Sequence, residues 1–146
     1  MKKLIPIIFL FIALYIGWNH FSLQNDSASF IEQSDTSDSA LSIAFDEQKS
    51  GIQSQGNGIV IKILLDDNDG SRHQRFILKL NSGQTLLIAH NIELAPRLAD
   101  LREGDIVAFN GVYEWNSKGG VIHWTHHDPS GRHVPGWLKH KGQTHQ

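Results

Sequence analysis

The stretch that decides the fold is Ile59-Val60-Ile61-Lys62-Ile63-Leu64-Leu65, followed by Asp66-Asp67-Asn68-Asp69-Gly70-Ser71. Alternation of large apolar residues with their neighbours is typical of a β-strand, here with one strongly apolar face formed by Ile59, Ile61, Ile63 and Leu65. The acids, Asn and Gly that follow favour a chain reversal, because they tolerate positive φ angles and bond to nearby backbone groups. The spacing of these acids does not fit an EF-hand calcium loop.

Further strands are predicted as the sequence is followed outward from this turn. We expect a second strand over His73–Leu80, a third over Gln84–Ile92, a short helix over Pro96–Arg102, a fourth strand over Ile106–Trp115 and a fifth over Val121–Thr125. Three strands, a short helix and two strands are the order of an OB-type barrel, in which the helix plugs one end. The predicted class is all-β with one short helix, in a five-stranded OB-like barrel. A small sandwich would produce similar alternation.

The N-terminus has the pattern of an export signal. Lys2 and Lys3 precede an apolar run from Leu4 to Trp18, and we interpret residues 1–21 as a signal peptide or a membrane anchor, an apolar helix ahead of the folded domain. The run is shorter than the ~20 residues of a full membrane span, which suits a cleaved signal, and small residues for cleavage lie at Ser27-Ala28-Ser29. Either form places the domain in the bacterial cell envelope, on the periplasmic side, secreted or anchored in the inner membrane.

Residues 22–50 are expected to form a flexible polar linker, because Ser, Asn, Gln and acids dominate there. Leu41, Ile43 and Phe45 offer the alternative of a short docking turn. The folded domain then covers residues 51–146. It contains ten Lys and Arg against nine Asp and Glu, which gives no strong electrostatic signal for nucleic acid.

Functional side chains are concentrated near the C-terminus, in His123-Trp124-Thr125-His126-His127-Asp128-Pro129-Ser130-Gly131-Arg132-His133. In a straight strand His123 and His127 would lie about 13 Å apart, at ~3.3 Å per residue, and could not share one ion. The turn signal of Asp128–Gly131 allows the chain to bend back. Because the chain has no cysteine, any metal site must use His, Asp or Glu, and the candidate ligands of a divalent metal such as zinc are His126, His127, Asp128 and His133.

Two functional classes and one structural interpretation remain open for this tail. We favour a binding module for an anionic ligand, an oligosaccharide or a nucleic acid, with the candidate residues Arg72, His73, Arg75, Arg132 and Trp137. The alternative is a metal-dependent hydrolase of nuclease or phosphodiesterase type that uses the metal candidates named above. In the structural interpretation these polar groups satisfy one another, and His90 is a hydrogen-bonded, half-buried histidine. At least three of His73, His123, His126, His127, Asp128, Arg132 and His133 should have side-chain tips within about 5 Å of another member if the histidines converge.

Several uninterrupted motifs carry a resemblance to a known family. They are Gly70-Ser71-Arg72-His73-Gln74-Arg75-Phe76, Leu87-Ile88-Ala89-His90-Asn91-Ile92, Tyr113-Glu114-Trp115-Asn116, Gly120-Val121-Ile122-His123-Trp124-Thr125-His126-His127-Asp128 and Gly136-Trp137-Leu138. Over about residues 51–146 the chain resembles a bacterial family, the domain of unknown function 3465. The resemblance implies no activity, so function has to be argued from the residues.

Overall fold

The computed structural model describes residues 36–146, which contain one helix and seven strands. Residues 36–46 are helical, and the strands are β1 (Ile52–Ile63), β2 (His73–Lys79), β3 (Thr85–Asn91), β4 (Ile106–Glu114), β5 (Val121–His123), β6 (Trp137–His140) and β7 (Gln143–His145). The predicted signal or anchor of residues 1–21 lies outside the described residues. Within residues 36–146, no helix is long and apolar enough to span a bilayer.

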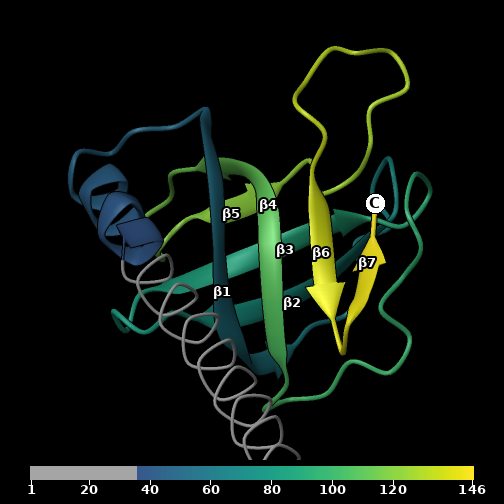
Figure 1. Cartoon of the computed structure of the whole chain (residues 1–146), viewed down its shortest axis with the longest axis horizontal. Helices are drawn as coiled ribbons and strands as arrows, with labels where there is room; N and C mark the ends of the chain where they lie inside the picture. The colour runs from purple at the N-terminus through teal and green to yellow at the C-terminus, as the bar shows by residue number, and fades with distance from the viewer. Residues whose placement is uncertain (1–35) are drawn as a thin grey trace, which may run out of the picture. The chain divides into compact units, whose positions relative to one another are not determined.

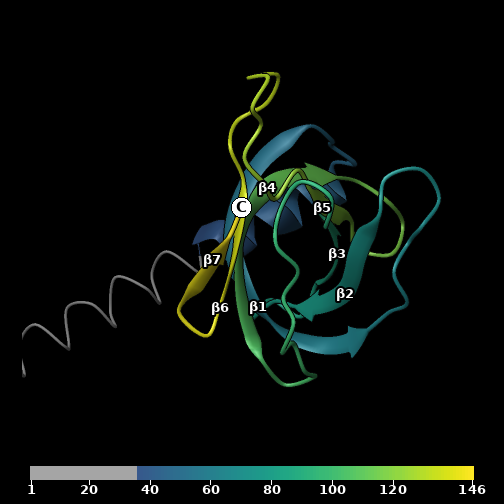
Figure 2. The same cartoon turned by 90° about the vertical axis from the view of Figure 1, so that its right-hand side faces the viewer.

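Five strands close into a barrel. Their order is β1-β2-β3-β5-β4, and β4 pairs back onto β1. All of these pairings are antiparallel except that of β3 with β5, which is parallel. Figure 2 looks into the barrel, and Figure 1 shows the β6–β7 hairpin extending the sheet beside β4. The predicted five-stranded OB-like barrel is therefore confirmed, with two additional strands.

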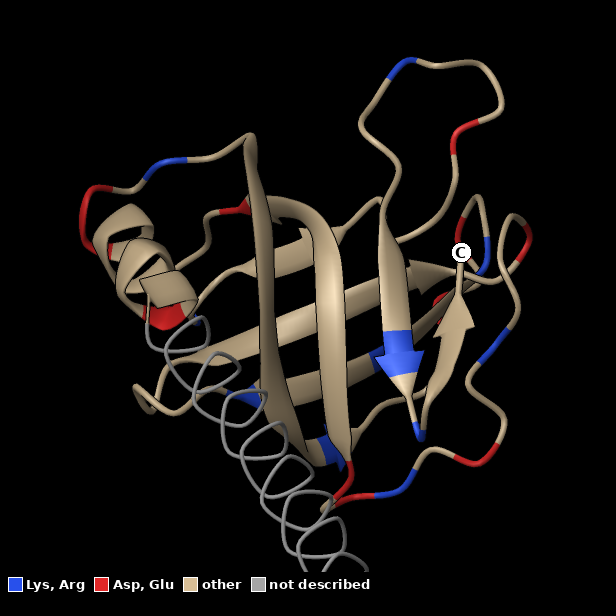
Figure 3. Ribbon diagram, viewed as in Figure 1, with Lys and Arg blue, Asp and Glu red and all other residues tan. Residues whose placement is uncertain are grey.

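The core is built from the inward-facing residues of these strands. Phe76, Leu86, Phe109, Tyr113 and Ile122 are almost completely buried. In β2 and β3 the burial alternates along the sequence, as it does when one face of a sheet covers a core, and in β4 it alternates as far as Gly111. Figure 3 shows that charged residues occupy mainly loops and strand ends, while β1 and β4 are uncharged along most of their length.

The helix lies at a different point of the chain from the one predicted. Residues 36–46 were expected to belong to a flexible linker, but they are helical, and Leu41 and Ala44 join the barrel core. The indole N–H of Trp115 donates to the Phe45 carbonyl at 3.1 Å, which ties this helix to the chain after β4. The alternative of a short docking turn agrees with the structure at Leu41, which is buried against the barrel, but not at Ile43, which is 57% exposed.

The helix expected over Pro96–Arg102 does not form. Ala95, Leu98 and Leu101 are buried at helical spacing, but the backbone of Leu98 is paired in another way. The buried Gln74 side chain donates from Nε2 to the Leu98 carbonyl at 3.0 Å and accepts the Leu98 N–H on Oε1 at 2.9 Å. This side-chain amide replaces helical hydrogen bonds, so the segment crosses the end of the barrel as an irregular loop (Figure 1).

The apolar face predicted for the first strand is not the buried face. Val60 is buried, whereas Ile59, Ile61 and Ile63 are 49%, 43% and 41% exposed. A β-bulge shifts the pairing of β1 with β2 between Val60 and Lys62. A bulge inserts one residue and thereby reverses which face later side chains occupy. Ile59 lies before the bulge and is already on the outer face, because Gly56, Gly58 and Val60 form the buried face of β1. The predicted apolar face was therefore wrong from its first residue, and beyond Val60 no side chain of β1 is buried. The expected turn is present, because Asp67 Oδ1 accepts the Asp69 N–H at 3.1 Å.

Candidate functional site

The histidine-rich segment lies in the long loop between β5 and β6, and we call residues 124–136 the tail loop. β5 pairs with Val112–Glu114 of β4, and β6 pairs with Val107–Asn110 of the same strand. The tail loop therefore leaves and re-enters the sheet beside one edge of β4, and Figure 1 shows it projecting from the barrel. At the base of the loop only glycine fits at position 136, because a Cβ there would lie 2.0 Å from the Trp124 carbonyl oxygen.

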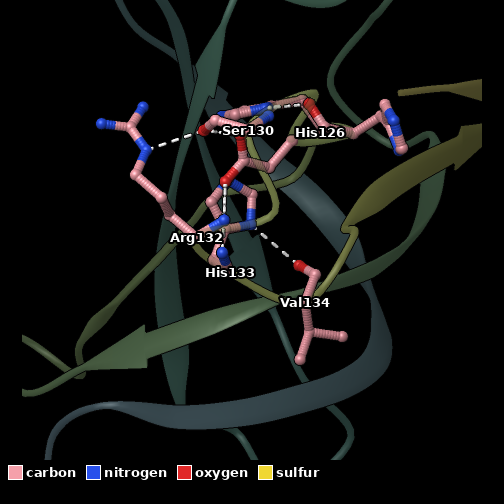
Figure 4. Close-up of polar contacts among 7 residues, drawn as sticks. His126, Ser130, Arg132, His133 and Val134 are labelled. Carbon is pink, nitrogen blue, oxygen red and sulfur yellow. Dashed lines mark hydrogen bonds and ion pairs between the residues drawn. The ribbon is translucent and has the colours of Figure 1, made fainter.

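Asp128 organises the tail loop. One carboxylate oxygen accepts the Ser130 N–H at 2.8 Å and the Ser130 hydroxyl at 2.5 Å. The other accepts the N–H groups of Arg132 at 2.5 Å and His133 at 3.2 Å (Figure 4). The hydrogen bond from the Ser130 hydroxyl has the largest effect on the pKa of Asp128, and those from the backbone N–H groups add to it. Together they hold the pKa of Asp128 well below its usual value. The carboxylate is thus an anionic centre around which the loop backbone is fixed.

Aromatic rings gather at the base of the tail loop. The Trp124 ring is stacked on His133, with 4.8 Å between centroids and an interplanar angle of 18°, and lies 4.8 Å from the His123 ring. His133 in turn meets the edge of His126 at 5.0 Å. We call these four residues the ring cluster. Trp124 is 43% exposed and has a φ of 52°, a left-handed conformation that is rare for a bulky residue. Such backbone strain recurs at functional sites.

A buried histidine connects the tail loop to the barrel. His90 on β3 is fully buried, and its Nδ1 accepts a hydrogen bond from the Thr125 hydroxyl at 2.8 Å. Its Nε2–H donates to the Pro96 carbonyl at 3.2 Å, which also accepts from Nδ1–H of His145 at 3.1 Å. Burial lowers the pKa of His90 to about 4, so this ring is neutral at pH 7. His90 was expected to be hydrogen-bonded and half-buried, and it is buried completely.

Arg132 presents its guanidinium group at the surface of the tail loop. Its Nε donates to the Ser130 hydroxyl at 2.8 Å, and Figure 4 shows the two terminal nitrogens pointing away from the labelled groups. Among residues 36–146 no carboxylate lies within ion-pair distance of this guanidinium. The guanidinium therefore keeps hydrogen-bond donors and a positive charge available to a ligand.

The structure does not assemble the four predicted metal ligands. Asp128 uses both carboxylate oxygens on the loop backbone, as described above. Nδ1–H of His126 donates to the His127 carbonyl at 2.8 Å, and Nδ1–H of His133 donates to the Val134 carbonyl at 2.9 Å. The His127 side chain is exposed. Across the part of the chain that the structure describes, no three His, Asp or Glu side chains are placed to hold one ion.

Three members of the predicted set nevertheless converge. The rings of His126 and His133 lie 5.0 Å apart, and Nε2 of His133 is 3.9 Å from Oδ2 of Asp128. His123 lies on the same side of the barrel, with its Nε2 3.5 Å from a Glu114 oxygen. Burial lowers the pKa of His123. The Asp128–Gly131 turn therefore bends the chain back as predicted.

Arg72, directly before β2, forms a separate group with His73 and Arg75 of that strand. Arg72 pairs with Glu93 at 3.5 Å, while Arg75 donates to the Leu65 carbonyl at 3.1 Å and lies 3.7 Å from an Asp67 oxygen. His73 bridges to Asp67 through the backbone. Acids of the adjoining loops thus neutralise both arginines, and within residues 36–146 no hydrogen bond or ion pair joins them to Arg132.

Trp137 lies at the point where the tail loop re-enters the sheet. On β6 it pairs with Asn110, which pairs with Gln55 of β1, and the neighbours of Trp137 and Asn110 along the chain are buried. The Asn110 side chain donates to the Pro135 carbonyl at 3.2 Å, so this row adjoins the tail loop. The Lys139 ammonium lies 4.6 Å from the centroid of the Trp137 ring. Trp137 therefore contributes to the outer surface and does not fill the core.

Sequence reasoning missed two contributions to this end of the barrel. His145 is buried and shares the Pro96 carbonyl with His90, and Trp124 was not among the candidate binding residues. The left-handed backbone at Trp124 has no sequence signal, because non-glycine residues rarely adopt it. A shallow pocket of about 420 Å³ lies elsewhere, beside Phe45, Gln84 and Lys118, and contains none of the predicted site residues.

Residues 26–146 match the sequence profile of a family described as "Protein of unknown function (DUF3465)". No curated protein matches the chain.

Proposed function

The chain belongs to the DUF3465 family, and because the description of that family assigns no function, we propose from the site itself that the protein is a binding module for an anionic ligand. The ligand contacts the tail loop, with Arg132 as its anion-binding residue and the ring cluster as a neighbouring surface. Ligands that combine a negative charge with a flat ring, such as nucleotides, suit this combination best.

The single observation that carries the proposal is that the Arg132 guanidinium, which pairs with no carboxylate of residues 36–146, lies on a loop that Asp128 holds in place. A guanidinium binds phosphate or carboxylate through two parallel hydrogen bonds, which makes it more selective than a lysine. Four hydrogen bonds to the Asp128 carboxylate fix the backbone on both sides of Arg132. Less conformational entropy is then lost when the anion binds.

The ring cluster supports a ligand that also has a flat face. Trp124 exposes 43% of its surface beside His133 and His123, and aromatic side chains stack on bases and sugars. Arg72 and Arg75 are less suited to bind an anion, since each already faces an acid. We therefore assign the ligand to the tail loop rather than to β2.

We place the module in the cell envelope, on the periplasmic side of the inner membrane. Lys2 and Lys3 before the apolar run Leu4–Trp18 support export, either as a secreted protein or as one that the run anchors in the membrane. Fusion of alkaline phosphatase after residue 50 tests the location. An inactive fusion held in the cytoplasm would contradict export.

A metal-dependent hydrolase has less support from the described residues. Asp128, the predicted carboxylate ligand, bonds to Ser130, Arg132 and His133 with both oxygens. Freeing it for an ion would dismantle the loop on which the other candidates lie. If the wild type hydrolyses a phosphodiester and His127→Ala loses this activity while it keeps the fold, the result would support the hydrolase.

The test of the proposed function is an NMR titration of the full chain with three defined probes: adenosine monophosphate, inorganic phosphate and glucuronate. We expect the Nε–H of Arg132 and the indole N–H of Trp124 to shift with at least one probe, and those of Arg72 and Trp115 to stay unchanged. Shifts confined to β2, or no shift at the tail loop with any probe, would overturn the proposal.

A further inference from the structure

Three isoleucines form an exposed apolar patch on the outside of the barrel. Ile59, Ile61 and Ile106 are 49%, 43% and 62% exposed. Ile59 of β1 pairs directly with Ile106 of β4, and Ile61 follows two residues later at the bulge. Scattered apolar residues on a protein surface are normal, but a contiguous group of large ones marks an interaction site.

Two lysines border the apolar side chains. Lys79 of β2 is the partner of Ile59 on the side away from Ile106, and Lys62 follows Ile61 directly. Both lysines are exposed, and neither makes an ion pair with another residue of the described part of the chain. We call Ile59, Ile61, Ile106, Lys62 and Lys79 the isoleucine patch.

The acids beside the isoleucine patch are already engaged. Asp105 accepts from Nε2 of His140 at 2.8 Å and pairs with Lys141 at 3.2 Å. Glu103 accepts the backbone N–H of Ile63 at 3.3 Å. The patch therefore offers an apolar surface with two unpaired positive charges, and a partner that matches it is apolar beneath a negatively charged surface.

We infer that the isoleucine patch rests on the surface of an anionic lipid bilayer. Apolar side chains that enter the headgroup region, flanked by lysines that attract anionic lipids, are the features of peripheral membrane contact. A protein partner would need a matching apolar face, whereas the chain itself supplies a route to the bilayer. This inference rests on the proposal that the apolar run Leu4–Trp18 anchors the protein.

The length of the chain before residue 36 makes this contact reachable. Residues 22–35 separate the predicted anchor from the first described residue of the helix, and 14 residues span at most roughly 50 Å at about 3.4 Å each. A tether of that length keeps the barrel at a high effective concentration near the bilayer. A weak contact is then enough to orient the domain on the membrane.

The absence of cysteine from the sequence allows a direct test with the full chain. One cysteine is introduced as Ile61→Cys and, as a matched control, as Ser117→Cys. Ser117 is exposed and follows the end of β4 opposite to Ile106. Each protein is labelled with an environment-sensitive fluorophore and reconstituted into phosphatidylglycerol–phosphatidylcholine vesicles, with and without spin-labelled lipids that quench fluorescence on contact.

We expect blue-shifted emission and at least twofold quenching at position 61, and neither at position 117. Pure phosphatidylcholine vesicles, or Lys62→Gln with Lys79→Gln, should reduce the quenching. If the labels at positions 61 and 117 have the same emission and neither is quenched, on a chain that still floats with the vesicles, the docking of the isoleucine patch is overturned. The proposal of an N-terminal anchor is then unaffected. A chain that stays out of the vesicle fraction would overturn both. Energy transfer between labels at position 61 without lipid quenching would assign the patch to a second copy and overturn the lipid contact.

Discussion

The hydroxyl of Thr125 donates to Nδ1 of His90 across 2.8 Å inside the barrel, and both residues are completely buried. This hydrogen bond joins the end of β3 to the base of the tail loop. It also selects the tautomer of His90, because Nε2 must then carry the proton that it donates to Pro96. The position of the tail loop depends on this buried polar contact.

Replacement of Thr125 by valine tests that dependence. Thr125→Val keeps the shape of the side chain but leaves a buried ring nitrogen without a donor, which costs roughly 1–3 kcal/mol. We expect the free energy of unfolding, measured by urea denaturation at pH 7.5, to fall by this amount. Thr144→Val, at an exposed position of β7, is the control and should change it little. Equal stabilities of the two variants would argue against the contact.

Acid should weaken the fold between pH 6.5 and pH 4. The pKa of His90 is lowered from 6.5 to about 4, so the unfolded chain binds a proton in this range and the folded chain does not. Stability therefore falls as pH falls through this window, by about 3 kcal/mol in total at 1.36 kcal/mol per pH unit. Urea denaturation between pH 7.5 and pH 4 should show this slope, and His90→Gln should reduce it. An unchanged slope in that variant would contradict the assignment.

Two carboxylates act in a different pH window. The hydrogen bond from His140 lowers the pKa of Asp105 from 3.8 to about 2, and Asp128 is also depressed. Their contribution to stability is present above pH 4 and is lost as pH falls further, because the folded chain then resists protonation. In Asp105→Asn the fall in stability below pH 4 should therefore be smaller than in the wild type. Above pH 4 the dependence of stability on pH should be the same in both proteins. Acid denaturation followed by circular dichroism measures this.

The tail loop should loosen without its central carboxylate. Asp128→Asn retains one acceptor oxygen for four donors, so the backbone between residues 130 and 133 loses hydrogen bonds. We expect amide hydrogen exchange of Ser130, Arg132 and His133 to accelerate, while amides of β3 and β4 keep their rates. Asp69→Asn, in the exposed turn after β1, provides the comparison. Uniform acceleration throughout the barrel would show that the loop is not a separate unit.

Gly136 should tolerate no side chain. A Cβ there would lie 2.0 Å from the carbonyl oxygen of Trp124 and 2.7 Å from that of Asn110, and both contacts are with backbone atoms. Gly136→Ala should therefore destabilise the fold by roughly 2–4 kcal/mol, in the range of severe packing defects. Gly70→Ala has a positive φ but open space, and it should cost about 1 kcal/mol. Thermal unfolding of the two variants compares them.

The alternation of apolar residues predicted the barrel because it reports which strands have a buried face. Strands β2 to β5 were expected to within two residues at every end, and their order implied the closure. The bulge at Ile61 and the two hydrogen bonds between the Gln74 side chain and the Leu98 backbone were not predictable. In both places the local sequence allows more than one backbone conformation, and contacts with distant residues determine which one forms. The helix over residues 36–46 owes its stability to burial of Leu41 against strands far away in the sequence.

The candidate site was predictable in composition but not in geometry. The turn signal at Asp128 indicated that the histidines after β5 fold back, and His133 does meet His126 and Asp128. Residue type alone could not distinguish an aspartate that binds a metal from one that caps a loop. That distinction depends on which donors surround the carboxylate, and here they are backbone N–H groups and one hydroxyl.

The most direct test of the binding proposal is the affinity of Arg132→Gln for adenosine monophosphate, measured by calorimetry beside the wild type and Arg72→Gln. A hydrogen bond to a charged group contributes about 1.5–3 kcal/mol, so its loss should weaken binding at least tenfold. Arg72→Gln should remain within about twofold of the wild type, because Glu93 already pairs with that arginine. Unchanged affinity in Arg132→Gln, with a loss in Arg72→Gln, would contradict the account.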